Sequence, residues 1–141
     1  MKKDGPIVII EDDLDDQDLL GEVFKQLNYP NQIVFFSNGE DTLRYLMSSD
    51  ESPFIILSDI NMPKMNGFEL REKIQNNEKL RLKCIPYLFF TTSTQQELVI
   101  DAYSKSAQGF FTKPHTFSEL VRVMKNIVEY WKDCHSPNVI V

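Results

Sequence analysis

The sequence predicts an α/β protein built on a doubly wound, five-stranded parallel sheet. Short apolar runs recur without polar alternation, which is typical of strands buried on both faces of a parallel sheet. An amphipathic helical pattern follows each run, and strict alternation of strand and helix indicates a parallel sheet covered by helices on both sides. The length of 141 residues suits one compact domain.

Five runs are predicted to form the strands. They are Ile7–Ile10, Ile33–Phe36, Phe54–Leu57, Tyr87–Phe90 and the shorter Gly109–Thr112.

Five amphipathic stretches between and after these runs are predicted to form the helices, because their apolar residues recur at helical spacing. The stretches are Leu19–Leu27, Leu43–Met47, Leu70–Ile74, Leu98–Tyr103 and Leu120–Trp131. Three helix starts carry the pattern of a capping box, in which a hydroxyl and a glutamate satisfy free backbone N–H groups. The pairs are Ser37 with Glu40, Thr94 with Glu97, and Thr116 with Glu119.

Composition limits the classes of function. With 42% hydrophobic residues the chain can build a core. A formal net charge of −6 argues against nucleic acid as a direct partner, since binding there is driven by basic residues that release counterions. No apolar stretch approaches membrane-spanning length, and two isolated cysteines, Cys84 and Cys134, fit a reducing compartment. We therefore expect a cytoplasmic protein that binds neither nucleic acid nor membrane.

The domain boundary is predicted near residue 133, with a domain over 1–133 and a C-terminal tail over 134–141. The tail contains Pro137 and ends in three apolar residues, Val139–Val141. A frayed terminus is the simpler interpretation. A docked tail or an oligomer contact is the alternative, and a homodimer stays open at this point.

Chemistry concentrates where the predicted strands end, which is where ligands bind in open parallel sheets. Glu11 and Asp12 follow the first strand, Asp59 follows the third, and Lys113 follows the fifth. If the first and third strands are neighbours, three carboxylates converge and repel each other unless a cation compensates them. Oxygen ligands that leave positions for water and phosphate oxygens suit Mg²⁺. The sequence therefore predicts a magnesium site, and a solvated acidic loop is the alternative.

These residues resemble the signature of response-regulator receiver domains of two-component signalling. Besides the acids, the resemblance rests on Thr91, on Lys113-Pro114 and on the loop Ser58–Gly67, and it extends from about residue 6 to about residue 131. It implies a flavodoxin-like (βα)5 fold with strand order 2-1-3-4-5. It also implies a stand-alone phosphorylation-dependent regulator rather than an enzyme in the usual sense, one that assists its own phosphoryl transfer and dephosphorylation.

The resemblance assigns a role to each matching position. Asp59 is expected to accept a phosphoryl group from a partner histidine kinase or histidine phosphotransfer protein. Glu11, Asp12, Asp59 and the main-chain carbonyl of Asn61 are expected to bind Mg²⁺. Lys113 is expected to pair with the phosphoryl oxygens, and Pro114 to be cis.

The resemblance also implies a switch. Thr91 is expected to donate its hydroxyl to the phosphoryl group, which vacates space for Phe110. Many receivers have tyrosine at the Phe110 position, so one hydrogen bond of the switched state is missing here. The surface of the fourth helix, fifth strand and fifth helix is expected to control a separate output protein. Asn61 and Ser93 are expected to tune dephosphorylation, and since neither is an acid or a base, slow to moderate loss of phosphate is predicted.

The sequence also has alternative interpretations. A flavin carrier would need a small, hydroxyl-rich loop after the first strand, where this chain has acids. An aspartate-nucleophile phosphatase would need a second aspartate at the position of Asn61. A receiver-like docking module that never uses phosphate is the third alternative. The basic residues Lys79, Arg81 and Lys83 are interpreted as a solvated loop, with kinase docking as the second interpretation.

Overall fold

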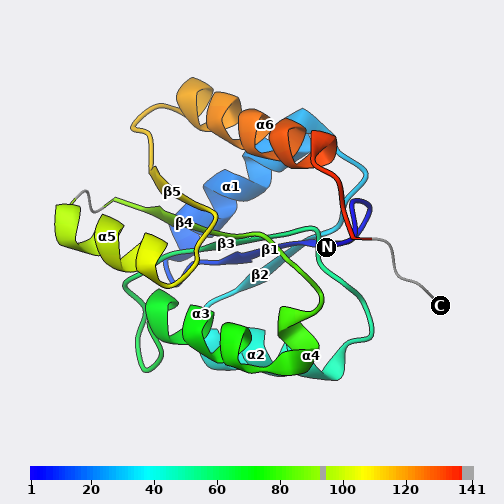
Figure 1. Ribbon diagram of the computed structural model, residues 1–141. Coiled ribbons are helices and arrows are strands. Elements are labelled where there is room, and N and C mark those ends of the chain that lie inside the picture. The colour runs from blue at the N-terminus through cyan, green and yellow to red at the C-terminus, as the bar shows by residue number, and fades with distance from the viewer. Residues whose placement is uncertain (93–94, 138–141) are drawn as a thin grey trace.

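The computed structural model describes residues 1–92 and 95–137 and shows one parallel sheet between two layers of helices (Figure 1). Its five strands lie in the order β2-β1-β3-β4-β5, as the resemblance implied. The strands are β1 (Ile7–Ile10), β2 (Ile33–Phe36), β3 (Ile55–Ser58), β4 (Tyr87–Thr91) and β5 (Gly109–Thr112). The helices are α1 (Leu14–Leu27), α2 (Gly39–Ser48), α3 (Gly67–Asn76), α4 (Glu78–Arg81), α5 (Gln96–Ser104) and α6 (Phe117–Asp133).

The register of the strands brings their carboxyl ends to one edge of the sheet. Ile10, the last residue of β1, lies opposite Ser58 at the end of β3. Thr91 at the end of β4 lies opposite Thr112 at the end of β5. The residue that follows each strand therefore enters a shared region, at the left in Figure 1, while the N-terminus lies at the opposite end of the sheet.

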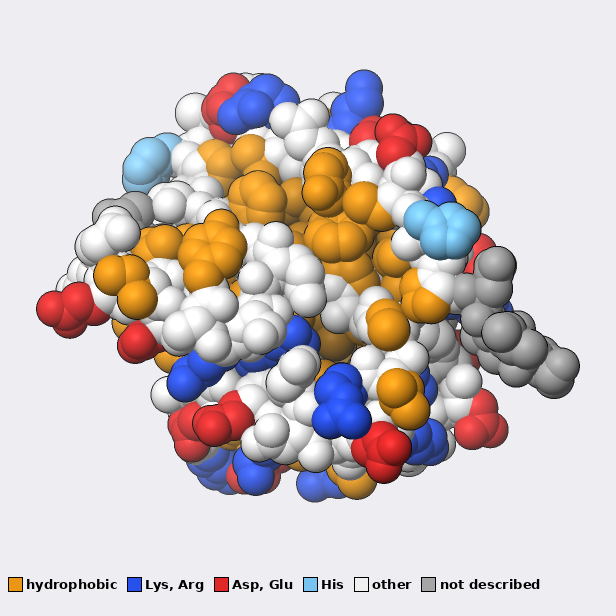
Figure 2. Space-filling view, viewed as in Figure 1, with side chains coloured by type: hydrophobic (Ala, Val, Ile, Leu, Met, Phe, Trp, Pro, Cys, Tyr) orange, Lys and Arg blue, Asp and Glu red, His pale blue; other side chains and the backbone are white. Residues whose placement is uncertain are grey.

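The central strands match the prediction of burial on both faces, and the edge strands do not. Every residue of β1, β3 and β4 is buried, whereas all four residues of β2 are only half-buried. An edge strand has a neighbour on one side alone, so apolar sequence by itself does not ensure full burial. Hydrophobic side chains also gather around the other edge strand, β5, on the face shown in Figure 2.

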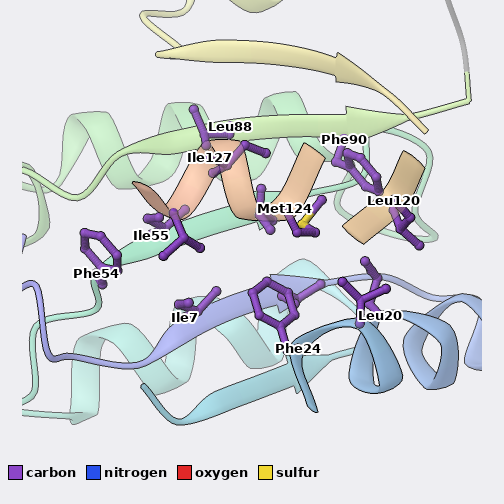
Figure 3. Packing of buried hydrophobic residues seen from close by; sticks show 14 residues of the cluster. Ile7, Leu20, Phe24, Phe54, Ile55, Leu88, Phe90, Leu120, Met124 and Ile127 are labelled. Atoms are coloured by element: carbon purple, nitrogen blue, oxygen red, sulfur yellow. The ribbon is translucent and has the colours of Figure 1, made fainter. Parts of the chain in front are cut away.

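Two hydrophobic cores hold the layers together. On one face, α1 and α6 pack on the sheet through residues such as Phe24, Met124 and Ile127 (Figure 3). On the other face, Leu46, Leu70 and further residues of α2, α3, α4 and α5 form the second core. Burying one such side chain contributes about 1.5–3 kcal/mol to the stability of the fold, so these two cores hold the strand ends in place.

The helix starts agree only in part with the predicted capping boxes. Thr116 accepts a hydrogen bond from the backbone N–H of Glu119, as expected. The cap of α2 is Asn38, which accepts from the N–H of Asp41, so the prediction for Ser37 was wrong by one residue. Asparagine caps a helix as well as serine does, which hides the boundary in the sequence. The Thr94 prediction lies outside the described residues.

A short helix, α4, follows α3 where the sequence predicted a solvated loop. Helix α4 carries Lys79 and Arg81, both exposed, while Leu80 between them is buried in the second core. The side chain of Asn77 accepts from the N–H of Leu80 and starts the turn. Local capping together with one buried leucine thus makes a helix of four residues. No helix in the described part of the chain has the length and apolarity needed to cross a membrane.

Gly67, the first residue of α3, lies against the loop that follows β3. A Cβ atom at this position would lie 2.2 Å from the carbonyl oxygen of Asp59 and 3.0 Å from the ring of Phe89. The Gly67 N–H also donates to the carbonyl of Ile60 at 2.9 Å. Only a residue without a side chain permits this approach of two backbone segments.

We predict that Gly67→Ala destabilises the fold by about 1–3 kcal/mol, because the backbone of Asp59 must move to admit a methyl group. Gly21→Ala is the matched control, since a Cβ at Gly21 in α1 meets nothing within 4 Å. This control should stabilise the protein by about 0.5–1 kcal/mol through helix propensity. Urea unfolding of the three proteins measures both effects, and equal stabilities for the two variants would contradict the close approach at Gly67.

Candidate functional site

Two acidic residues occupy equivalent positions directly after neighbouring strands. Glu11 follows β1, and its N–H donates to the carbonyl of Phe36 at 2.9 Å. Asp59 follows β3, and its N–H donates to the carbonyl of Ile10 at 3.0 Å. The sheet hydrogen bonding thus extends one residue beyond the strands and fixes where both side chains begin.

Glu11, Asp12 and Asp59 form one cluster, as the sequence predicted. Each offers a carboxylate oxygen, and these oxygens all lie within 4.8 Å of one another. Glu11 is buried, Asp59 is half-buried and Asp12 is exposed. Like charges about 4 Å apart repel by about 1 kcal/mol in water and about 4 kcal/mol at an effective dielectric of about 20. The cluster therefore needs positive charge, and an oxygen-only donor set of this kind fits a hard divalent cation.

The ammonium group of Lys113 supplies one positive charge. Its Nζ lies 2.5 Å from Oε2 of Glu11, 3.1 Å from Oδ2 of Asp16 and 3.3 Å from Oδ2 of Asp59. Lys113 reaches this position because its own N–H donates to the carbonyl of Thr91 at 2.8 Å and extends the β4–β5 pairing. One lysine is thus shared among three carboxylates from β1, α1 and β3.

The pKa values of the site reflect burial and this sharing of charge. Burial raises the pKa of Glu11 to about 7, against the hydrogen bond from Lys113, which favours the charged form. Burial alone would lower the pKa of Lys113. Its hydrogen bonds to Glu11 and Asp16 and the charge of Asp59 outweigh that effect and raise it instead. Lys113 therefore keeps its positive charge, while burial makes the negative charge of Glu11 costly.

Asp59 is held from one side and open on the other. Its Oδ1 accepts from the N–H of Ile60 at 2.7 Å, and its Oδ2 faces Lys113. The side chain is 12% exposed. A carboxylate whose orientation is set by a backbone N–H and a lysine, yet which solvent can reach, has the geometry of a nucleophile for an incoming electrophile.

The remaining predicted residues surround this centre. Thr91 is buried at the end of β4. Phe110 is half-buried in β5 and contacts the ring of Phe89, with 6.4 Å between ring centroids. Asn61 is exposed two residues after Asp59, and Ser93 lies outside the described residues.

One expectation from the resemblance is wrong. The described residues contain no cis peptide bond, so the bond between Lys113 and Pro114 is trans. Trans is the intrinsically favoured form of such a bond, by about 0.5–1 kcal/mol. Here Lys113 reaches the acidic cluster in that form.

The structure adds two residues that sequence reasoning missed. Asp16 contacts Lys113, and Gln17 donates through its side-chain amide to the carbonyl of Glu11. Asp16 comes four residues after Asp12 in the same acidic stretch, and that stretch was the available signal. Asp13, the next acid after Asp12, caps α1 by accepting from the N–H groups of Asp15 and Asp16.

Comparison with known proteins identifies the family. The model of the response regulator receiver domain matches residues 7–125. The chain belongs to this family. Receiver domains are signalling regulators that interact with histidine kinases and output proteins, and membership decides against the flavin-carrier and phosphatase interpretations.

Two curated receivers are similar over most of their length. The probable methanogenesis regulatory protein FilR2 of Methanothrix harundinacea is 31% identical over 129 residues, which cover 89% of this chain and 82% of FilR2. The response regulator Rcp1 of Synechocystis is 28% identical over 130 residues, covering 89% of this chain and 87% of Rcp1.

Solved structures of receivers share the fold. The phosphorylated cyanobacterial phytochrome response regulator RcpA has a TM-score of 0.84 at 26% identity, covering 94% of this chain and 98% of RcpA. The Mn²⁺-bound form of Rcp1 has a TM-score of 0.79 at 26% identity, with the same coverage. Receiver domains bind a divalent metal, and the acidic cluster of this chain fits such a site.

We predict that Lys113→Met destabilises the protein by about 3 kcal/mol when divalent metals are chelated, because Glu11 and Asp59 lose their counter-charge in a largely buried place. Lys125→Met, on the exposed side of α6, is the matched control and should change stability by less than about 0.5 kcal/mol. Thermal unfolding in a chelator compares the two variants. Equal melting temperatures would show that Lys113 does not carry the charge balance of the site.

Proposed function

We propose that this chain is a phospho-acceptor signalling switch in which Asp59 receives a phosphoryl group from a partner histidine kinase or histidine phosphotransfer protein. The observation that carries the proposal is the convergence of Asp59 with Glu11, Asp12 and Lys113 at one edge of the sheet. Membership in the receiver family supports it.

The proposed transfer exchanges one bond to phosphorus for another. An oxygen of the Asp59 carboxylate would attack the phosphoryl group of a phosphohistidine whose other ring nitrogen carries a proton. The N–P bond would break, its electron pair would return to the ring nitrogen, and neutral imidazole would leave. The N–H of Ile60 orients Asp59 for this attack. Lys113 already lies beside Oδ2 of Asp59 and would pair with the phosphoryl oxygens as negative charge accumulates on them.

The cofactor of the proposed reaction is Mg²⁺. Glu11, Asp12 and Asp59 would bind it, together with the main-chain carbonyl of Asn61. When bound, Mg²⁺ supplies the charge neutralisation that lets an anionic carboxylate approach an anionic phosphoryl group. The proximity of the three carboxylates supports this assignment, and Mn²⁺ in the related Rcp1 supports a divalent ion at such a site.

Phosphorylation would be read out through Thr91 and Phe110. A phosphoryl group on Asp59 would accept a hydrogen bond from the Thr91 hydroxyl, and the space that Thr91 leaves would admit the ring of Phe110. The surface that changes is formed by α5, β5 and α6, which correspond to the fourth predicted helix, the fifth strand and the fifth predicted helix. Exposed apolar side chains on this surface, among them Ile100, Tyr103 and Tyr130, suit an output protein or a second copy of the chain (Figure 2).

The wider setting follows from these assignments. We propose a cytoplasmic regulator made of the domain 1–133 and the tail 134–141, whose output acts through a separate protein. The match covers 82% of FilR2 and 87% of Rcp1, which supports a role carried by the receiver domain itself. The net charge of −6 supports a partner other than nucleic acid, and two free cysteines suit a reducing compartment.

We predict that incubation with acetyl phosphate and Mg²⁺ adds the mass of one phosphoryl group, and that Asp59→Asn abolishes the gain because it removes the nucleophilic carboxylate. Asp18→Asn, an exposed position of α1, is the matched control and should retain the gain. Intact-protein mass spectrometry makes the measurement. If the wild type gained no mass from this donor or from any active histidine kinase, the proposal would fail.

We also predict that the phosphorylated protein loses its phosphate slowly to moderately, since neither Asn61 nor Ser93 offers an acid or a base to the attacking water. Ser93→Glu is expected to change the phosphate lifetime, which radiolabel retention or repeated mass spectra can follow. An unchanged lifetime would count against tuning from this position.

A further inference from the structure

Arg71 of α3 is a buried cation that has no carboxylate partner in the part of the chain that the structure describes. The residue is only 4% exposed. No ion pair joins it to an acid among residues 1–92 and 95–137. Instead its Nε donates to the carbonyl of Lys105 at 3.2 Å, and its Nη2 donates to the carbonyl of Ser106 at 2.6 Å. The guanidinium therefore binds the carboxyl end of α5, where carbonyls free of helix partners carry partial negative charge.

The second partner of Arg71 is Tyr87, the first residue of β4. The guanidinium carbon lies 5.4 Å from the centre of the Tyr87 ring, at the distance of a cation–π contact. Tyr87 is fully buried, and its hydroxyl donates to the carbonyl of Gly67 at 2.9 Å. Burial raises the pKa of Tyr87, which keeps its hydroxyl a donor.

Gly67 brings this set of contacts to the phospho-acceptor. Its backbone lies so close to the Asp59 carbonyl that a Cβ would come within 2.2 Å. It also donates to the carbonyl of Ile60, whose own N–H holds Oδ1 of Asp59 at 2.7 Å. Gly67 and Ile60 therefore connect the Asp59 carboxylate to the Tyr87 hydroxyl through backbone contacts.

At its other end the set of contacts reaches the start of β5. Ser106 has a φ of 63°, a left-handed conformation that serine adopts only when its surroundings hold it. Gln108, two residues on, is tied to Tyr87 twice: its N–H donates to the Tyr87 carbonyl at 3.0 Å, and its side chain accepts from the Tyr87 N–H at 2.7 Å. Phe110, the proposed switch aromatic, follows two residues later in β5.

We propose that Arg71 is a positioning residue that couples the Asp59 end of β3 to the connection between α5 and β5. The link runs from Asp59 through Gly67 and Tyr87 to Arg71 and ends on the carbonyls of Lys105 and Ser106. It gives the α5–β5–α6 surface a second connection to the phospho-acceptor, separate from Thr91 and Lys113. A role of this coupling in signalling rests on the proposed function, whereas the contacts between Asp59 and Ser106 do not depend on it.

A structural role alone would explain the burial of Arg71 but not transmission between two sites. Burying a cation is costly unless its hydrogen bonds are satisfied, so removing Arg71 is expected to lower stability under either interpretation. A measurement of stability therefore does not distinguish a purely structural role of Arg71 from a coupling role. The two roles differ in whether a change at Asp59 alters the structure around Ser106.

The first experiment needs no ligand. Asp59→Asn is introduced into the wild type, into Arg71→Met and into Arg122→Met, a control on the surface of α6 whose guanidinium pairs with Glu119. Backbone amide chemical shifts are compared by NMR within each pair of proteins. We expect Asp59→Asn to shift the amides of Lys105, Ser106 and Gln108 in the wild type and in the control. In Arg71→Met these shifts should fall about twofold or more.

The route through Lys113 is intact in every background, so it cancels in this comparison. Tyr87→Phe removes only the hydroxyl that bonds to Gly67 and serves if Arg71→Met folds poorly; it should weaken the same shifts. The inference is overturned if Asp59→Asn does not shift the amides of residues 105–108 in the wild type. It is also overturned if Asp59→Asn shifts these amides in Arg71→Met and in Tyr87→Phe as much as in the wild type.

The second experiment adds Mg²⁺ and beryllofluoride, a mimic of an acyl phosphate, to the same proteins with Asp59 present. The Gly67 amide should respond in all of them, while Ser106 and Gln108 should respond less in Arg71→Met than in Arg122→Met. A wild type that shows no response at any residue would sink the proposed function and leave the ligand-free comparison to judge Arg71. A full response at Ser106 and Gln108 in Arg71→Met would overturn the inference while sparing the proposed function.

Discussion

The repulsion among carboxylates at the ends of β1 and β3 is the constraint on which the rest of the structure depends. Glu11, Asp12 and Asp59 lie close enough that their charges must be compensated, and Lys113 compensates them only in part. This shortfall of positive charge makes the site suited to a cation, and the cation in turn makes it suited to a phosphoryl group. Attraction to the same carboxylates holds the ammonium group of the lysine in place although its stem is flexible.

Backbone geometry maintains that unfavourable arrangement. The parallel register puts Glu11 and Asp59 on adjacent strand ends, and the close approach of Gly67 fixes the loop behind Asp59. Two buried cores supply the free energy that holds these segments in place. The unfavourable electrostatic free energy of the charged site is therefore offset by the apolar cores on both sides of the sheet, as is common at functional sites.

Much of this arrangement could be predicted from sequence, because apolar runs, helical periodicity and strand-end acids are local patterns. What escaped prediction depends on tertiary contacts. Asp16 gained its role from the position of Lys113, almost a hundred residues away in the chain. Likewise, no sequence pattern marks Arg71, because its partners are the backbone carbonyls of Lys105 and Ser106, just after α5. The cap of α2 at Asn38 was missed for a different reason: adjacent Ser37 and Asn38 are equally good caps.

The surplus of negative charge around Asp59 would also affect which donors can transfer a phosphoryl group to it. Acids outnumber basic residues by 21 to 15 in the chain, and four acids, Glu11, Asp12, Asp16 and Asp59, lie in the acidic cluster or against its lysine. Small anionic metabolites are repelled by such a surface, and this repulsion becomes stronger as the ionic strength falls. A protein donor can place basic side chains of its own against the rim and cancel the field locally. The electrostatics of this edge of the sheet would therefore make transfer from a protein donor faster than transfer from a small anionic donor such as acetyl phosphate, without preventing the latter.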